Sequence, residues 1–280
     1  MGHQCFDVTI SDRVAHLKLC RPDALNTMIP EFWDELPNIV AEIDRGSEAR
    51  VIVISSTGKH FSAGMDLSVF MGDSSLLGNS GVTEEARRHS HLWLTVQHLQ
   101  DTFTALEAVR MPVLAAIQGG CIGGAVDMVC AADMRYATED AFFCIHEINI
   151  GMTADVGTLQ RLPKLIPEGI AKEWAYTGDR IPAQRAKEAG FVNQVFADHE
   201  SLVAGVLDIA GRIAEKSPLA IWGTKEMISY TRDHSVADSL RYMAGWQSGM
   251  FTGGDMAEEF TAKAEGRDRV FEELPRLPRR

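Results

Sequence analysis

Two short apolar runs, each followed directly by a glycine-rich stretch, place the strongest constraint on the fold. RVIVISS (50–56) precedes GKHFSAGMDL (58–67), and PVLAAIQ (112–118) precedes GGCIGGAVD (119–127). Apolar runs of this length that do not alternate with polar residues are typical of strands covered on both faces. Such a sheet needs helices on two sides, so the chain is predicted to be an α/β protein.

The other patterns divide the chain into a mixed part and a helical part. The first twenty residues predict a β-hairpin, MGDSSLLGNSGV (71–82) is the most loop-like stretch, and a long helix is predicted from about 83 to 110. Later strands are predicted at 134–139, 141–147 and 191–196. From about 199 onward only helices are predicted, at roughly 199–216, 218–232, 235–251 and 255–265. We therefore predict an α/β core over residues 1–198 and a helical region over 199–280.

The composition excludes several classes of function. Lysine and arginine number 27 against 39 aspartates and glutamates, which gives a net charge of -12. An acidic chain is poorly suited to binding nucleic acids or anionic membranes, and its apolar runs are too short to span a bilayer. The five cysteines lack a C-x-x-C pair and the nine histidines lack an H-E-x-x-H spacing, so neither a disulfide nor a metal site is predicted. The N-terminus lacks a secretory pattern and the C-terminal RLPRR is not an S-K-L address, so a cytoplasmic location is expected.

The glycines of GGCIGG permit a tight turn and a close approach of backbone to ligand. They lead into a predicted helix, whose first N–H groups are unpaired and carry partial positive charge. A developing oxyanion could be stabilised there, and one such donor is typically worth about 3–4 kcal/mol of barrier. The stretch matches neither the phosphate-binding loop nor the dinucleotide fingerprint, and Ser62 is not in a G-x-S-x-G elbow, so nucleophilic hydrolysis is disfavoured.

Three acids stand beside these glycines or in the otherwise apolar segment HEINIGMTADVG (146–157). Asp127 follows the glycine turn in a predicted apolar helix, where it either faces that turn or is satisfied by neighbouring backbone or by Arg135. Glu147 is either an exposed strand end or a functional acid. Asp155 precedes VGTLQRL, where an N-cap aspartate is equally expected. Acids in apolar surroundings need a partner or a purpose, so all three are candidate catalytic residues.

Taken together, GKHFSAGMDL, GGCIGGAVD, RPDALN near the N-terminus and SPLAIWGTKEMI near the C-terminus resemble the crotonase family, also called the enoyl-CoA hydratase/isomerase superfamily. The resemblance runs essentially from end to end. It implies a spiral of repeated ββα units with a C-terminal α-helical trimerisation region, assembled as a homotrimer or a dimer of trimers. It also implies an acyl-CoA thioester substrate and no cofactor, because coenzyme A is part of the substrate.

The family's shared device is a pair of backbone N–H groups that hold the thioester carbonyl, and it falls here on Met65 and Gly124. By the same match, the residues that contact the substrate and its coenzyme are Ala24, Leu25, Ala63, Gly64, Asp66 and Leu67. Members often have a basic residue near position 23, where this chain has Asp23.

The segment from GGAVD to LQRLPKL is similar to one subgroup of the family, the delta3,5-delta2,4-dienoyl-CoA isomerases, whose motif contains the acids that stand here as Asp127, Glu147 and Asp155. These enzymes of fatty acid β-oxidation move a proton from C2 to C6 through a trienolate, which requires acids at two separated carbons. Our hypothesis is that Glu147 removes the C2 proton, Asp155 donates at C6, and Asp127 tunes or orients the pair.

Two other functions are considered. A hydratase adds water to 2-enoyl-CoA and normally uses two glutamates, whereas the first acid here is the shorter Asp127. A non-catalytic acyl-CoA-binding protein of the same fold would have lost its acids, whereas this chain retains all three.

Overall fold

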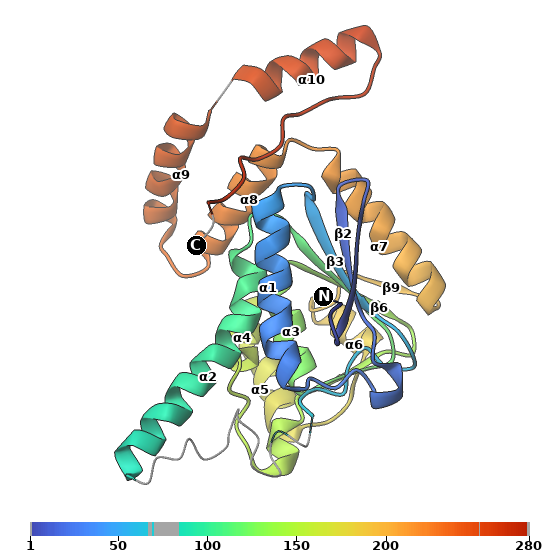
Figure 1. Ribbon diagram of the computed structural model, residues 1–280, viewed down its shortest axis with the longest axis vertical. Helices are drawn as coiled ribbons and strands as arrows, with labels where there is room; N and C mark the ends of the chain where they lie inside the picture. Colours follow the sequence, from blue (N-terminus) through green and yellow to red (C-terminus); the bar gives the residue numbers. More distant parts are fainter. Residues whose placement is uncertain (1, 67–68, 70–83, 252, 279–280) are drawn as a thin grey trace.

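A six-stranded sheet in the order β1-β2-β3-β4-β6-β9 carries the fold (Figure 1). The computed structural model describes residues 2–66, 69, 84–251 and 253–278; the predicted loop at 71–82 and Leu67 lie outside them. β1 and β2 form the predicted antiparallel hairpin, and every other pair in this sheet is parallel. A second sheet has the order β5-β7-β8.

The elements have the following bounds. The strands are β1 (Phe6–Ser11), β2 (Val14–Leu19), β3 (Val51–Ser56), β4 (Val113–Ile117), β5 (Gly120–Ile122), β6 (Met134–Thr138), β7 (Phe142–Cys144), β8 (Ile181–Pro182) and β9 (Gln194–Phe196). The helices are η1 (Pro22–Ala24), α1 (Pro30–Gly46), α2 (Glu85–Ala108), α3 (Gly124–Cys130), η3 (Glu147–Ile150), α4 (Thr158–Leu165), α5 (Glu168–Thr177), α6 (Ala183–Glu188), α7 (His199–Ala214), α8 (Pro218–Thr231), α9 (Val236–Met250) and α10 (Gly253–Glu265).

The apolar runs are covered on both faces, as predicted. Successive residues of a strand point to opposite sides, so Val51 and Val53 of β3 pack toward α7 while Ile52 and Ile54 join the larger core under α1, α2 and α3. All six residues of β3 are buried. Because α7 packs against β3, β4 and β6, it belongs to the core by its contacts, and the boundary predicted at residues 198 and 199 stays a prediction.

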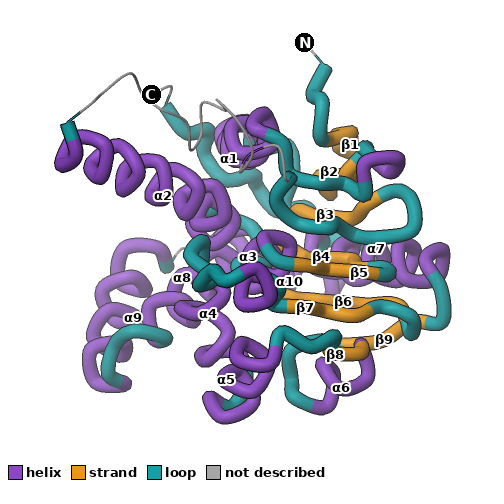
Figure 2. Tube along the Cα trace, turned by 90° about the horizontal axis from the view of Figure 1, so that it is seen from below, coloured by secondary structure: helices purple, strands orange, loops and turns teal. Residues whose placement is uncertain are grey.

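The smaller sheet lies beside the larger one, with β5 following β4 and β7 following β6 along the chain (Figure 2). An isolated parallel bridge between Ser62 and Cys121 extends this second layer toward the segment after β3. The predicted GGCIGG turn is therefore a short strand followed by a turn, since Gly120–Ile122 pairs with β7. This stacking of strand pairs is the spiral of ββα units that the resemblance implies.

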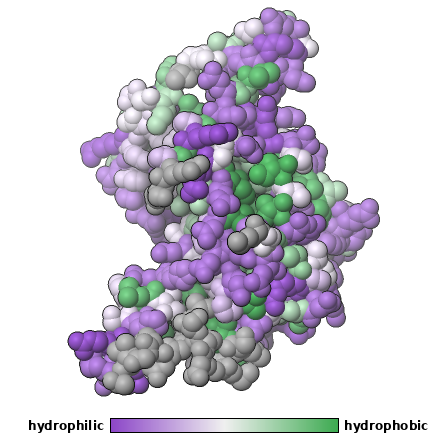
Figure 3. Space-filling model, viewed as in Figure 1, coloured by the Kyte–Doolittle hydropathy of each residue, from purple (hydrophilic) through white to green (hydrophobic). Residues whose placement is uncertain are grey.

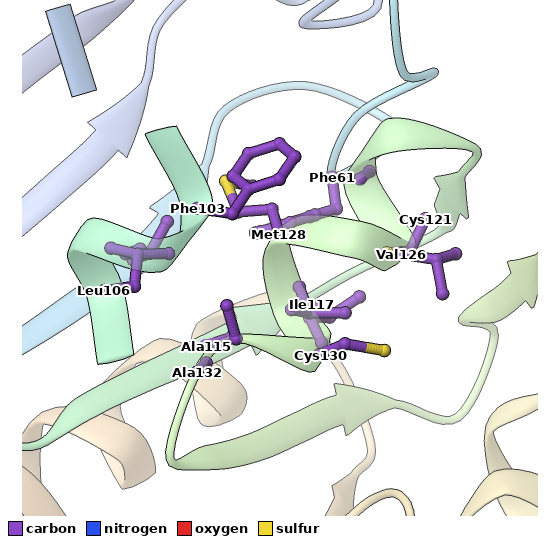
Figure 4. Packing of buried hydrophobic residues seen from close by; sticks show 14 of the residues in the cluster. Phe61, Phe103, Leu106, Ala115, Ile117, Cys121, Val126, Met128, Cys130 and Ala132 are labelled. Carbon is purple, nitrogen blue, oxygen red and sulfur yellow. The ribbon is translucent and has the colours of Figure 1, made fainter. Parts of the chain in front are cut away.

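The helix that follows the glycines, α3, is buried along its whole length. Figure 4 shows Val126, Met128 and Cys130 of this helix among side chains of α2 and β4. A helix surrounded in this way has no solvent-facing stripe, so any polar side chain on it must be satisfied by another part of the protein. Asp127 is that side chain.

α9 and α10 lie apart from the sheet, at the end of the molecule opposite the outer half of α2 (Figure 1), whereas α8 packs against the core through Lys225. The helical character predicted after residue 199 is confirmed. Within the described ranges, no helix is both long enough and apolar enough to cross a membrane.

Candidate active site

The site begins where two loops meet at the ends of β3 and β5. A Cβ atom on Gly64, which has φ +83°, would lie 2.5 Å from the Ile122 carbonyl oxygen, so only glycine permits this approach. Ser62 is fully buried and its hydroxyl donates to the Asn26 carbonyl oxygen at 2.8 Å, while the Gly64 N–H donates to that hydroxyl at 3.1 Å. The predicted non-nucleophilic Ser62 thus has a structural task.

The two predicted oxyanion donors lie side by side at this junction. The Met65 nitrogen is 3.8 Å from where a Cβ atom of Gly124 would be, and the Gly124 nitrogen is 3.2 Å from the corresponding point on Gly64. Met65 forms a bridge with Met28, but the N–H groups of that bridge come from Met28 and Asp66. Within the described part of the chain neither the Met65 nor the Gly124 amide donates to a protein acceptor. Both are available to a ligand oxygen.

The turn after β2 packs against the same loop and brings the predicted coenzyme-contacting residues together. The Ala63 N–H donates to the Leu25 carbonyl oxygen at 3.0 Å, and the Thr27 hydroxyl donates to Asp66 Oδ2 at 2.7 Å. Leu25 has φ +52° and a side chain that is 45% exposed, beside Ala24 at the end of η1. Of the predicted contact residues, only Leu67 cannot be placed, because it lies outside the described residues.

Glu147 lies directly over the glycine turn. A Cβ atom on Gly123 would lie 3.2 Å from Glu147 Oε1, which explains why that position, with φ +54°, is glycine. Glu147 is not a strand end, because β7 stops at Cys144 and Glu147 begins the short helix η3. Its Oε2 is buried without a hydrogen-bond partner among the described residues. One carboxylate oxygen is therefore free for a reacting group.

Asp127 performs a task that the sequence assigned to Asp155. The Thr158 N–H donates to Asp127 Oδ1 at 2.5 Å, so a fully buried aspartate of α3 caps the first turn of α4. The helix begins after Gly157, and no side chain of its own segment caps it. The expectation that Asp155 could be an N-cap is wrong, because tertiary packing supplies the acceptor from another helix. Arg135 also does not pair with Asp127; it donates to the carbonyl oxygens of Phe191, Val129 and Ala132.

Asp155 is half-buried in the irregular segment before α4, and its side chain is free of that helix. Its main chain is held from α2, where Gln100 Nε2 donates to the Asp155 carbonyl oxygen at 2.7 Å. Sequence reasoning missed Gln100, since these residues are 55 positions apart and a glutamine in a helix carries no signal of its own. It also missed Thr158, whose partner Asp127 is 31 positions away in the sequence.

The three acids influence one another electrostatically. Burial, together with the smaller effect of the charges of Asp127 and Asp155, raises the pKa of Glu147 to about 7. Burial likewise raises the pKa of Asp127 to about 6, against the lowering effect of its hydrogen bonds from Thr158. Burial also raises the pKa of Asp155. The structure thus brings the three predicted acids into one cluster in which each acid has a raised pKa.

No group of three or more histidine, cysteine, aspartate or glutamate side chains in the described ranges is arranged to hold a metal ion. Two free amides beside a carboxylate that is protonated near neutral pH can stabilise an enolate oxygen and move a proton at the adjacent carbon.

Comparison with known families agrees with this geometry. Residues 9–274 match the family model described as enoyl-CoA hydratase/isomerase. The chain belongs to this family. Its fold agrees with the assignment: enoyl-CoA hydratase from Bacillus anthracis superposes with a TM-score of 0.83 at 31% identity, covering 96% of this chain and 99% of that one. The predicted crotonase architecture is confirmed.

Two relatives with more similar sequences carry a narrower name. The chain is 41% identical to the mitochondrial Delta(3,5)-Delta(2,4)-dienoyl-CoA isomerase of Homo sapiens over 91% of its length and 77% of the relative's. It is 40% identical to the peroxisomal enzyme of that name from Arabidopsis thaliana, with 93% of each chain covered. The resemblance to the isomerase subgroup is confirmed within the enoyl-CoA hydratase/isomerase family.

The predicted cytoplasmic location is contradicted by these relatives, because their names describe them as mitochondrial and peroxisomal enzymes. That prediction is wrong. The prediction rested on the absence of two targeting motifs, and such an absence does not determine where a protein is located when other targeting signals exist.

We expect Asp127→Asn to change how stability depends on pH. Asparagine keeps an oxygen for the Thr158 N–H but cannot ionise. The folded-state pKa of Asp127, about 6, is raised above its ordinary 3.8, so its contribution is fully present below about pH 4 and is lost as pH rises through 6. Relative to the variant, the wild type should lose about 3 kcal/mol of unfolding free energy between these values.

Urea unfolding at pH 4, 5, 6 and 7.5 measures this difference, with Asp101→Asn on the exposed side of α2 as the matched control. A difference between wild type and Asp127→Asn that stays constant with pH would contradict the buried, coupled state of this acid.

Proposed function

We propose that this protein isomerises 3,5-dienoyl-CoA to 2,4-dienoyl-CoA, as an enzyme of fatty acid β-oxidation. The observation that carries the proposal is the coupled acid cluster beside two unpaired amides, with Glu147 over the glycine turn and Asp155 on a separate segment. The activity named for the human and Arabidopsis relatives supports the same reaction. Coenzyme A enters as part of the substrate, and no further cofactor is proposed.

The thioester carbonyl oxygen would accept hydrogen bonds from the Met65 and Gly124 amides. Because both donors are fixed by the backbone and need no rearrangement, they would stabilise the negative charge that develops when a C2–H bond breaks. Glu147 lies next to this pair of amides and therefore next to C2, so it is assigned the C2 proton. The electron pair left behind is delocalised over the carbonyl and both double bonds as a trienolate.

Asp155 would supply the proton at C6. The trienolate's electrons then form the C2–C3 and C4–C5 double bonds and restore the carbonyl, so one proton leaves C2 and one arrives at C6. In the unliganded protein Glu147 holds its proton up to about pH 7, so the proposed reaction requires that the bound thioester leaves Glu147 ionised and Asp155 protonated. Solvent exchange resets the pair after each turnover.

Asp127 makes a hydratase reading less favourable. A hydratase needs two carboxylates that hold the attacking water, but Asp127 Oδ1 is already occupied by the Thr158 amide, which leaves only the buried Oδ2 for such a water. Its place in the proposed reaction is to hold the segment that follows Asp155 and to raise the pKa of Glu147 through its charge. Hydration of crotonyl-CoA is the assay that separates the two reactions.

The activity is tested by incubating the protein with 3,5-octadienoyl-CoA and following the conjugated 2,4-diene by its ultraviolet absorbance. We expect Glu147→Gln and Asp155→Asn each to lower kcat by roughly 10²–10⁴-fold, because each removes one proton-transfer group while keeping shape. The wild type should hydrate crotonyl-CoA far more slowly than it isomerises the diene. An inactive wild type, or full activity in both variants, would rule out the proposed reaction.

The rate should depend on pH in a bell-shaped way. The reactive state of the Glu147–Asp155 pair holds one proton: with two protons no base remains, and with none there is no acid for C6. Since the pKa of Glu147 is raised to about 7, kcat/KM should fall as pH rises above about 7 and fall again below the raised pKa of Asp155. A rate that keeps rising to pH 9 would show that the pair does not share a proton in this way.

We also propose that the protein is a homotrimer or a dimer of trimers assembled through its last three helices. Apolar side chains there are exposed to an extent that a monomer rarely tolerates: Ile228 is 69% exposed, Leu240 65%, Phe251 60% and Phe260 65%. Ile228 and Phe251 also line a groove of about 470 Å³ between α8, α9 and the start of α10. Figure 3 shows hydrophobic residues among hydrophilic ones at this end of the molecule.

Light scattering after gel filtration should give a mass of about three or six times the 30.8 kDa of one chain. The double variant Leu240→Glu with Phe251→Glu should give single chains, because it places charges on the apolar surface. Tyr176→Glu on α5, where the side chain is 72% exposed, is the control and should leave the mass unchanged. A monomeric wild type at micromolar concentration would contradict the assembly.

A further inference from the structure

The segment that carries Asp155 is irregular and depends on other elements for its position. Residues 153 to 157 belong to no helix or strand. A group that must donate a proton at one defined carbon needs a fixed position, since a displacement of about 1 Å can cost roughly 10²-fold in rate. The contacts that fix this segment therefore bear on the reaction.

Those contacts come from one face of α2. Gln100 Nε2 donates to the Asp155 carbonyl oxygen at 2.7 Å. One turn later, the Thr104 hydroxyl accepts from Arg161 Nη2 at 3.1 Å, and Glu107 Oε2 accepts from Arg161 Nε at 2.7 Å. Gln100, Thr104 and Glu107 are spaced i, i+4 and i+7, which places them on one stripe of the helix. We call these three residues the α2 polar stripe.

A neighbouring stripe of α2, about 100° around the helix from the polar stripe, anchors the helix in the core. Leu99, Phe103 and Leu106 are 3%, 0% and 0% exposed, and Phe103 packs against Trp33 of α1. A helix held in this way is a rigid support, and the polar stripe transmits that rigidity to the segment before α4. Glu107 is itself fixed from a second side, because its Oε1 accepts from Arg232 Nη1 at 2.7 Å.

Arg161 folds back over the turn between Asp155 and α4. Gly157 has φ +137°, and a Cβ atom there would lie 1.8 Å from Arg161 Nη1, so the turn is shaped around the guanidinium. The segment is thus held at its start by Gln100, at its end by the Asp127–Thr158 hydrogen bond, and through Arg161 by Thr104 and Glu107. Of these contacts, only the one from Gln100 is made to Asp155 itself.

We infer that Gln100 is a positioning residue for Asp155, and that the α2 polar stripe fixes the end of the site where the distal proton is delivered. This inference rests on the proposed isomerase function. Glu147 is held differently, by the Met152 N–H that donates to its carbonyl oxygen at 2.9 Å and by the Asn149 side chain that donates to the Gly178 carbonyl oxygen at 2.8 Å. Loss of Gln100 should therefore impair proton delivery at C6 and leave proton removal at C2 intact.

The test separates these two steps. Gln100→Met keeps the length of the side chain and its helix propensity but removes the donor to Asp155. With 3,5-octadienoyl-CoA in deuterated buffer, formation of the 2,4-diene reports the complete reaction, and deuterium at C2 of recovered substrate reports the first step alone. We expect kcat for isomerisation to fall about 10-fold or more, KM to stay within about twofold, and the ratio of C2 exchange to isomerisation to rise by a similar factor.

Gln97→Met is the matched control, because Gln97 lies one turn earlier on α2 and is exposed. It should resemble the wild type in rate, exchange ratio and thermal midpoint. An unchanged isomerisation rate in Gln100→Met, or an equal loss of isomerisation and C2 exchange, would overturn the positioning role. A wild type that exchanges C2 but forms no 2,4-diene would instead overturn the proposed function, whichever way the variants behave.

Discussion

The close approach of two loops, one after β3 and one after β5, is the constraint on which the rest of the site depends. It exists because position 64 has no side chain to meet the Ile122 carbonyl oxygen, and it leaves the Met65 and Gly124 amides adjacent and without an acceptor among the described residues. Leaving such donors unpaired costs free energy unless a ligand oxygen or water satisfies them. Buried braces such as the Ser62 hydroxyl hold the loops in this arrangement without a ligand. The site is therefore preorganised by its backbone.

Much of the fold and of the candidate site could be predicted from the sequence, because the patterns that indicate them are local. The apolar runs, the glycines that follow them and the spacing between Asp127 and Glu147 are all visible in the sequence. The family resemblance predicted the Met65 and Gly124 amides, which lie side by side in the structure. The errors arose where a partner came from far along the chain. The cap of α4 comes from Asp127, 31 residues before Thr158, so a local rule that prefers an aspartate near the helix start chose Asp155. Gln100 has no local signal at all, since its task exists only once α2 packs beside the turn.

The cap also explains why an aspartate at position 127 suits this chain. A short carboxylate in a fully buried helix reaches the Thr158 amide directly, and a glutamate would need to fold an additional methylene into a core without space. The charge of Asp127 remains close enough to raise the pKa of Glu147. One residue thus links the stability of α4 to the protonation of the acid at the glycine turn. That link is a reason to expect folding and proton transfer to respond together when this residue is altered.

The two proposed proton-transfer groups are supported by separate parts of the protein. Glu147 begins η3, whose backbone and Asn149 tie it to neighbouring residues and to Gly178, whereas Asp155 is held by the polar face of α2. A reaction that acts at C2 alone needs only the first support, and a reaction that spans C2 to C6 needs both at a fixed separation. Because the supports are independent, the distal acid can change while the oxyanion site and the proximal acid are retained. This division gives a physical reason why one fold can hold both hydratases and isomerases: the glycine turn supplies the common enolate chemistry, and α2 with the segment before α4 decides where the second proton is placed.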